Sequence, residues 1–344
     1  MYTLINHKSI FYLITILSFQ FINTSLNGGL NPLEWLQSNN NREILNLENK
    51  DESISKSLVR KAEAKKAKGN ISATQRIYKS ILLKYPKVKA AGSIAYERGI
   101  YLYEKNKWID AFNTFTIIKQ YHPSHPKLKE VIKLQYKCAE KTMHKQRKKS
   151  LGIFAPDPLN MDATPLFISF AALYPYDKNS PKALLNAARI SETCGELELA
   201  IGTLKQLIDN YPKSAVSPDA HIQIAFAYTE FIKGPAYDLE TTREAIRYCE
   251  DFLALFPNHA DIGKIEALYE RLLNTLANNR VILADYYYFS RRDNIAALIF
   301  YNEAITLAPD SQAAIEAKVR IDSIKQGVQP TTGTNFIKKL FFIR

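Results

Sequence analysis

The sequence predicts an all-α superhelix of about six helix pairs. Six prolines each close an aromatic or apolar stretch, at Pro86, Pro123, Pro175, Pro212, Pro257 and Pro309. Glycine accounts for only 12 of 344 residues, which disfavours glycine-rich phosphate loops and frequent tight β-turns. Hydrophobic residues make up 46% of the chain and charged residues 23%, so a largely disordered protein is excluded.

Small residues precede these prolines at regular spacing. Steps of twelve and twelve separate Gly99, Ala111 and Pro123, then Ala188, Ala200 and Pro212, and more weakly Ala62, Thr74 and Pro86. Two further sets fit with eight extra residues (Ala225, Ala245, Pro257) and with one extra residue (Ala284, Ala296, Pro309). This spacing is typical of tetratricopeptide repeats, in which small residues let two helices pack closely and proline ends the second helix.

The N-terminal part predicts export. The apolar run 10–22 follows His7 and Lys8 and is shorter than the roughly 20 residues that a spanning helix needs. We therefore expect residues 1–25 to be a signal peptide, with an uncleaved anchor as the alternative. The Asn-rich segment 26–55 is expected to be a polar linker.

The remaining chain divides into two blocks of repeats. We expect an N-terminal basic tetratricopeptide block at 56–146, a connection at 147–163, and a C-terminal block at 164–326. Within the second block, Ile262–Phe289 contains no turn signal and predicts one long helix, and Ser311–Lys325 predicts a capping helix.

Charge is unevenly distributed between the two halves. Residues 1–160 hold 27 Lys/Arg against 12 Asp/Glu, and residues 161–344 hold 19 against 22. The basic run 137–149 could contact a membrane surface, an acidic partner or nucleic acid. The apolar, cationic stretch 335–344 of the tail 327–344 could contact a membrane or a partner. A solvated helix end, and a tail that folds back on the last repeat, are the alternatives. Export argues against nucleic acid as a partner.

The stretch Glu244–Ile324 resembles the BamD (YfiO-type) family of outer-membrane protein assembly factors. The resemblance lies in Phe256-Pro257-Asn258, in the long helix from Leu276-Ala277 to Ala284-Asp285-Tyr286-Tyr287, and in Ser290-Arg291-Arg292 followed by Ile295-Ala296-Ala297. It extends less specifically to residue 163.

This resemblance implies a non-enzymatic scaffold on the periplasmic face of the outer membrane. Its partners would be the outer-membrane barrel insertase and unfolded outer-membrane proteins. Two features depart from the family: no lipid-anchoring cysteine follows the apolar run, and Phe300 stands near the place where members often carry an insertase-contacting arginine. A tetratricopeptide adaptor for another envelope process, such as division or secretion, is the alternative function.

Counting from the small marker residues gives candidate partner-binding side chains on the concave surface of the superhelix. They are Tyr96, Tyr103, Arg189, Phe226 and Tyr288, with Arg291 and Arg292 in a basic turn. Aromatic rings supply contact area and arginine supplies a fork of donors. Packing between repeats, or simple solvation for the two turn arginines, is the alternative role.

No motif for catalysis, cofactor binding or metal binding is recognisable. The chain contains no Walker A, G-x-S-x-G, H-E-x-x-H or G-x-G-x-x-G pattern. His122-x-x-His125 lacks further ligands at suitable spacing, and the three cysteines are expected to be buried small hydrophobic residues. We expect no enzyme activity, no cofactor and no metal; an enzyme with a regulatory helical array is a third possibility.

Overall fold

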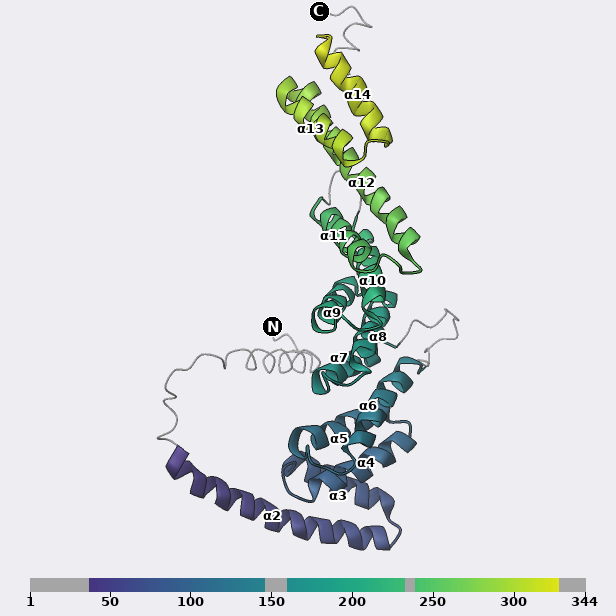
Figure 1. The fold of residues 1–344 in the computed structure, drawn as a ribbon. Coiled ribbons are helices and arrows are strands. Elements are labelled where there is room, and N and C mark those ends of the chain that lie inside the picture. The colour runs from purple at the N-terminus through teal and green to yellow at the C-terminus, as the bar shows by residue number, and fades with distance from the viewer. Residues whose placement is uncertain (1–36, 146–159, 233–238, 328–344) are drawn as a thin grey trace, which may run out of the picture. The chain divides into compact units, whose positions relative to one another are not determined.

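The computed structural model describes residues 37–145, 160–232 and 239–327. Within these ranges the chain forms thirteen α-helices, a short 3-10 helix and a π-helical segment, and no strand (Figure 1). The all-α prediction is therefore confirmed. The segment 1–25, most of the connection 147–163 and the tail from 328 onward lie outside the described residues.

The elements alternate as helical hairpins along the chain. In order they are α2 (Gln37–Ala67), α3 (Ile71–Lys84), α4 (Ala91–Glu104), α5 (Trp108–Tyr121), α6 (Leu128–Met143), η1 (Met161–Ala163), α7 (Thr164–Leu173), α8 (Ser180–Thr193), α9 (Leu197–Asn210), α10 (Ser217–Thr229), α11 (Leu239–Leu255), α12 (Ile262–Asp285), η2 (Tyr286–Arg291), α13 (Asn294–Leu307) and α14 (Gln312–Lys325).

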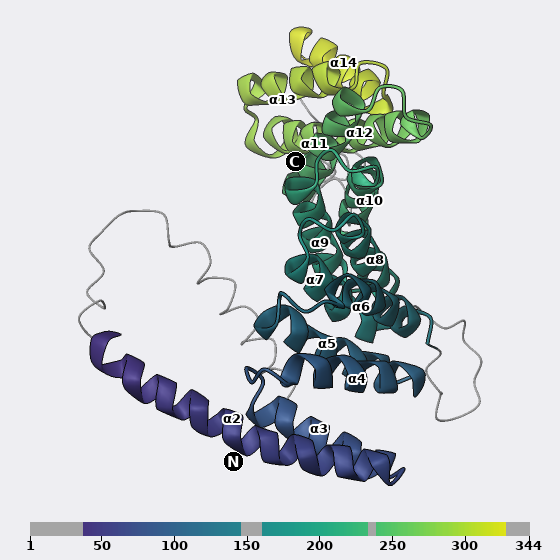
Figure 2. The ribbon, with the colours of Figure 1, turned by 60° about the horizontal axis from the view of Figure 1, so that its bottom comes forward.

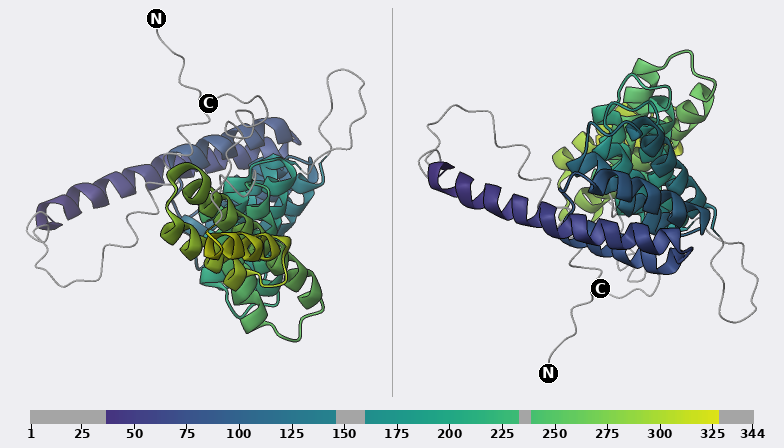
Figure 3. Two further views of the ribbon diagram at one scale, coloured as in Figure 1. Left: turned by 90° about the horizontal axis from the view of Figure 1, so that it is seen from above. Right: turned by 90° about the horizontal axis from the view of Figure 1, so that it is seen from below.

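The chain divides into two units, Met1–Ala90 and Ala91–Arg344. In the first unit, α2 and α3 lie side by side (Figures 2 and 3). Helix α2 begins inside the segment 26–55. Ala62 of α2 is fully buried beneath Thr74 of α3, whose Oγ1 donates to the Ala62 carbonyl at 3.4 Å.

In the second unit, α4/α5, α6/α7, α8/α9, α10/α11 and α12/α13 form five further pairs, and α14 packs on α13 and α12. Together with α2/α3 these make the six helix pairs that the sequence predicts. The expected long helix is α12 with its π-helical end, and the expected cap is α14, which begins with the Ser311 side chain accepting from Ala314 N at 3.1 Å.

Prolines set the end of every second helix. The residue before proline is pushed out of the helical region, and Tyr85, His122, Tyr174 and Tyr211 all adopt φ between −131° and −135°. After the first five prolines the following helix begins five residues later, as with Ala91 after Pro86, whereas α14 begins three residues after Pro309. The positions of the prolines therefore mark correctly where each helical hairpin ends.

The turn within four of the pairs also has a fixed register. A residue with positive φ precedes the buried small residue of the second helix by five positions: Gly69 before Thr74, Asn106 before Ala111, and Gly195 before Ala200. In the α12–α13 turn the positive-φ residue is Arg292, at φ 56°. The fully buried residue five positions later is Ala297.

The sixth repeat therefore uses Ala297 as its small residue, and the spacing-based choice of Ala296 is wrong by one position. Tyr301, four residues after Ala297, is the fully buried aromatic residue of α13. The cause is the π-helical segment. The Asp293 N–H bonds to the carbonyl six residues earlier, Tyr287, whereas Lys107 bonds to the carbonyl five residues earlier. A π-helical turn holds one additional residue.

Candidate protein-binding surface

Most of the candidate side chains lie on the first helix of a pair, and α8 and α10 present them most clearly. Ala188 and Ala225 are buried marker residues in equivalent positions. Arg189 and Phe226 follow them directly and point away from the hairpin core, with the Arg189 side chain 47% exposed and Phe226 36% exposed. We call the exposed residues of α8 and α10 around these two the α8–α10 surface.

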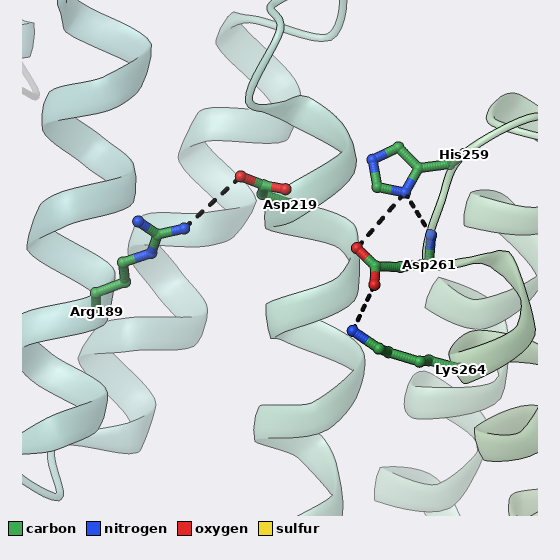
Figure 4. A network of polar contacts seen from close by, with 5 residues as sticks. All are labelled: Arg189, Asp219, His259, Asp261 and Lys264. Carbon is green, nitrogen blue, oxygen red and sulfur yellow. Dashed lines mark hydrogen bonds and ion pairs between the residues drawn. The ribbon is translucent and has the colours of Figure 1, made fainter.

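Arg189 connects two adjacent repeats. Its Nη2 lies 3.7 Å from the Asp219 carboxylate on α10 (Figure 4). With the Gln223 amide oriented so that its oxygen faces the guanidinium, Gln223 accepts from Arg189 Nε at 3.0 Å and from Nη2 at 3.3 Å. The guanidinium is thus held by two α10 side chains while about half of the arginine side chain stays open to solvent.

Two carboxylates make this surface mixed in charge. Glu192 lies one turn after Arg189 on α8, and Glu230 follows the last turn of α10. The pKa of Glu192 is raised, first by burial and then by the negative charge of Glu230, while Arg189 opposes the shift. A partner with both cationic and anionic groups, beside an apolar group for Phe226, would complement this arrangement.

A second polar cluster in Figure 4 belongs to the start of α12. The Asp261 N–H donates to His259 Nδ1 at 3.2 Å, and Lys264 Nζ lies 2.5 Å from the Asp261 carboxylate. The hydrogen bond from Lys264 lowers the pKa of Asp261. These contacts lie in the α11–α12 turn and the first turn of α12, and the Asp261 side chain makes no capping hydrogen bond to the helix.

Tyr288 is a core residue and not a groove residue. Its side chain is only 2% exposed, and it packs in the cluster that α12, α13 and α14 share with Tyr301 and Ala297. The π-helical segment carries Tyr288 toward α13, so its ring faces the hairpin interior. Of the consecutive tyrosines, Tyr286 is the exposed one, and Tyr287 stacks on Phe300 with ring centroids 5.4 Å apart.

The remaining candidates lie on other elements. Arg291 and Arg292 are exposed in the α12–α13 turn. Tyr96 and Tyr103 are half-buried on α4, and the Tyr96 ring lies 6.0 Å from the His125 ring. Burial raises the pKa of both tyrosines, and a hydrogen bond to Glu130 adds to the shift at Tyr96.

Sequence reasoning missed Asp285, although it occupies the position of Arg189 and Phe226, one residue after the marker Ala284. Asp285 accepts a hydrogen bond from the Tyr301 hydroxyl, and Arg320 Nε of α14 lies 3.8 Å from its carboxylate. Counting one residue past the marker Ala284 would have indicated Asp285. Asp219 and Gln223 were also missed, because only the fold places them beside Arg189.

The described residues show no second site with a different chemistry. In the part of the chain that the structure describes, no group of three or more His, Cys, Asp or Glu is placed to hold a metal ion. Burial raises the pKa of the Cys138 and Cys249 thiols from 9.0 to about 12, so neither is a thiolate at neutral pH. No helix within the described ranges is both long and apolar enough to cross a membrane.

Comparison with solved structures gives only distant similarity. A tetratricopeptide repeat protein from Parabacteroides merdae ATCC 43184 shares 13% identity, covers 76% of this chain and 96% of its own, and has a TM-score of 0.26. A human IFIT1 dimer with PPP-AAAA shares 15% identity, covers 80% and 75% of the two chains, and has a TM-score of 0.21. No curated protein matches the chain.

Comparison with protein families gives a more specific result. The model of the YfiO family, described as an outer membrane lipoprotein, matches residues 177–329. The match contains α8 to α14, and therefore the α8–α10 surface and the π-helical turn. The resemblance predicted from Glu244–Ile324 is thus confirmed, and we call residues 177–329, which the family model matches, the YfiO-type segment.

Proposed function

We propose that the chain is a non-catalytic scaffold of outer-membrane β-barrel protein assembly, acting at the periplasmic face of that membrane. The family match over residues 177–329 is the observation that carries this proposal. The partners would be the barrel insertase, unfolded barrel proteins, or both. Stacked helical hairpins suit such a role because their first helices form a continuous surface for another chain.

The α8–α10 surface is the proposed partner-binding site. Arg189 is oriented by Asp219 and Gln223 yet remains about half exposed, so it can donate to a partner without losing its position. Phe226 supplies an adjacent exposed ring. Tyr96 and Tyr103 on α4, and Arg291 and Arg292 at the α12–α13 turn, are proposed as secondary contacts.

Site-specific photo-cross-linking in envelope membranes tests the site. A photoreactive phenylalanine replaces Phe226 on α10, and, in a matched control, Ile299 on the outer face of α13, which is 54% exposed. We expect one discrete adduct from position 226, none from 299, and loss of the adduct when Arg189→Glu is added. An adduct at 299 that Arg189→Glu leaves intact would place the partner elsewhere.

The identity of the adduct tests the function. A barrel insertase or an unfolded barrel protein supports the proposal, and depletion of the chain should then lower the amount of outer-membrane barrels. The absence of a cysteine directly after the apolar run favours the second candidate, an adaptor for another envelope process. That candidate predicts a different adduct and unchanged barrel levels.

A further inference from the structure

The first unit carries an unusually one-sided charge. Residues 50–90 contain twelve Lys and Arg against three Asp and Glu, and all twelve cationic side chains are exposed. Of the three acidic residues only Glu63 is exposed. The YfiO-type segment 177–329 has the opposite balance, with 16 Lys and Arg against 21 Asp and Glu. The excess of cations is therefore greatest in the α2–α3 hairpin and its immediate continuation, while residues 91–145 hold ten Lys and Arg against five Asp and Glu.

These cations lie outside the faces on which α2 and α3 pack. The packing side of α2 contains the buried Ser55 and Ala62, and that of α3 contains Thr74, Tyr78 and Ile81. The cationic positions on the exposed sides are Lys50, Lys56, Arg60, Lys61, Lys65, Lys66, Lys68, Arg76, Lys79 and Lys84, followed by Lys87 and Lys89. Packing of the hairpin therefore explains none of the twelve charges.

Several of the cations stand next to one another at helical spacing. Lys56 and Arg60, and likewise Lys61 and Lys65, are four residues apart on α2, and Arg76 and Lys79 are three apart on α3. Like charges at these spacings destabilise an isolated helix. An anionic surface that neutralises them would remove this repulsion.

Two further observations distinguish between anionic partners. Residues 50–90 contain only two aromatic side chains, and neither is exposed: Tyr78 is buried and Tyr85 is half-buried, so the hairpin lacks the row of exposed rings on which successive bases stack. Among the cations, Leu83 is 72% exposed and Ile71 44% exposed. Exposed apolar side chains within a field of lysines are typical of surfaces that contact a membrane interface.

We propose that the α2–α3 hairpin, with residues 85–90, binds the anionic phospholipid headgroups of a membrane surface. The apolar run 10–22 precedes the α2–α3 hairpin in the sequence, and cations close to a membrane-directed segment add attraction to anionic lipid. This role is separate from protein binding by the α8–α10 surface. It would hold the chain at the membrane while the YfiO-type segment remains available to partners.

The test measures sedimentation of the full chain with vesicles of phosphatidylcholine alone and with vesicles that also contain phosphatidylglycerol. The readout is the ratio of the two partition coefficients, because the apolar run contributes to both. One variant carries Lys56→Gln, Lys61→Gln and Lys79→Gln, and each change removes one member of a like-charged pair, so folding is preserved. The matched control carries Lys178→Gln, Lys182→Gln and Lys213→Gln, which neutralise exposed lysines of the YfiO-type segment.

We expect the wild-type ratio to be well above one, to fall about ten- to a hundred-fold in the first variant, and to decline steeply with salt. The control variant should retain the wild-type ratio. A ratio of one, or an equal loss in both variants, would overturn the proposal. So would displacement from the vesicles by a short single-stranded DNA at stoichiometric concentration, which would identify a nucleic-acid surface instead.

Discussion

The ring of Phe115 lies directly over the α-carbon of Gly99. A Cβ built on Gly99 would be 2.2 Å from Cε1 of Phe115, and the ring itself is fully buried. The two residues are sixteen apart, on α4 and α5, and they hold the second repeat together. Glycine is therefore required here for close approach of the two helices, since its backbone is ordinary helix.

Replacement of Gly99 by alanine should destabilise the second unit. The added methyl group forces Phe115 out of a packed position, which costs about 1–3 kcal/mol through overpacking. The measurement is the free energy of unfolding by denaturant. Gly202→Ala on α9 is the control, because beyond its chain neighbours and its own helix backbone no atom lies within 4 Å of its Cβ position. That change should be neutral or stabilising by up to about 1 kcal/mol; similar losses in both variants would contradict the repeat register.

Arg292→Gly should stabilise the α12–α13 hairpin. Arg292 adopts φ 56°, where the equivalent turn positions Gly69 and Gly195 hold glycine. Removing its Cβ relieves strain worth about 1 kcal/mol, so the melting temperature should rise slightly. Arg291→Gly, inside the π-helical segment, should lower it instead. If Arg292 contacts a partner, the same stabilising change should weaken binding.

Gln135→Ala should be strongly destabilising. The fully buried Gln135 amide donates to the Phe112 carbonyl at 3.1 Å and to Thr116 Oγ1 at 3.0 Å, and its oxygen accepts from the Tyr174 hydroxyl at 2.5 Å. Truncation leaves a cavity and an unsatisfied hydroxyl, so we expect a loss of about 2–4 kcal/mol in chemical denaturation.

The double variant Gln135→Met, Tyr174→Phe tests this explanation. It removes both side chains of the Gln135–Tyr174 hydrogen bond while keeping most of their volume. The double variant should therefore be less destabilised than Gln135→Ala. An equal or larger loss would show that the hydrogen bonds are not the source of the effect.

The cysteines should differ in reactivity and should link stability to pH. At pH 8 a thiol reagent should modify the partly exposed Cys194 in the folded protein, and Cys138 and Cys249 only on unfolding. Cys194→Ser should abolish the fast reaction. Because burial raises the thiol pKa of Cys138 and Cys249 from 9.0 to about 12, their contribution to stability is complete below pH 9 and is lost toward pH 12. Equilibrium unfolding across this range measures the loss.

Sequence patterns were sufficient to predict the helical hairpins but not the side-chain contacts between neighbouring hairpins. Pro86 and Pro123 end helices by a local steric effect, so counting from them predicts boundaries. Counting in steps of twelve fails between Ala284 and Ala297. The repeat contains one additional residue, and the spacing alone does not show whether it lies before or after the small residue of the second helix. The pairing of Arg189 with Asp219 depends on the stacking of two repeats, which no local pattern encodes.

The π-helical end of α12 shows how a hairpin can accept an insertion without altering its interior. The added residue is taken up as a local widening next to Arg292, and Tyr301 still reaches the interior in the usual place. The N-terminal lengthening of α12 follows the same logic, because fourteen residues are about four whole turns. Repeats of unequal length in such proteins can therefore keep the same interior packing. An alignment based on repeat length alone would misplace the buried side chains.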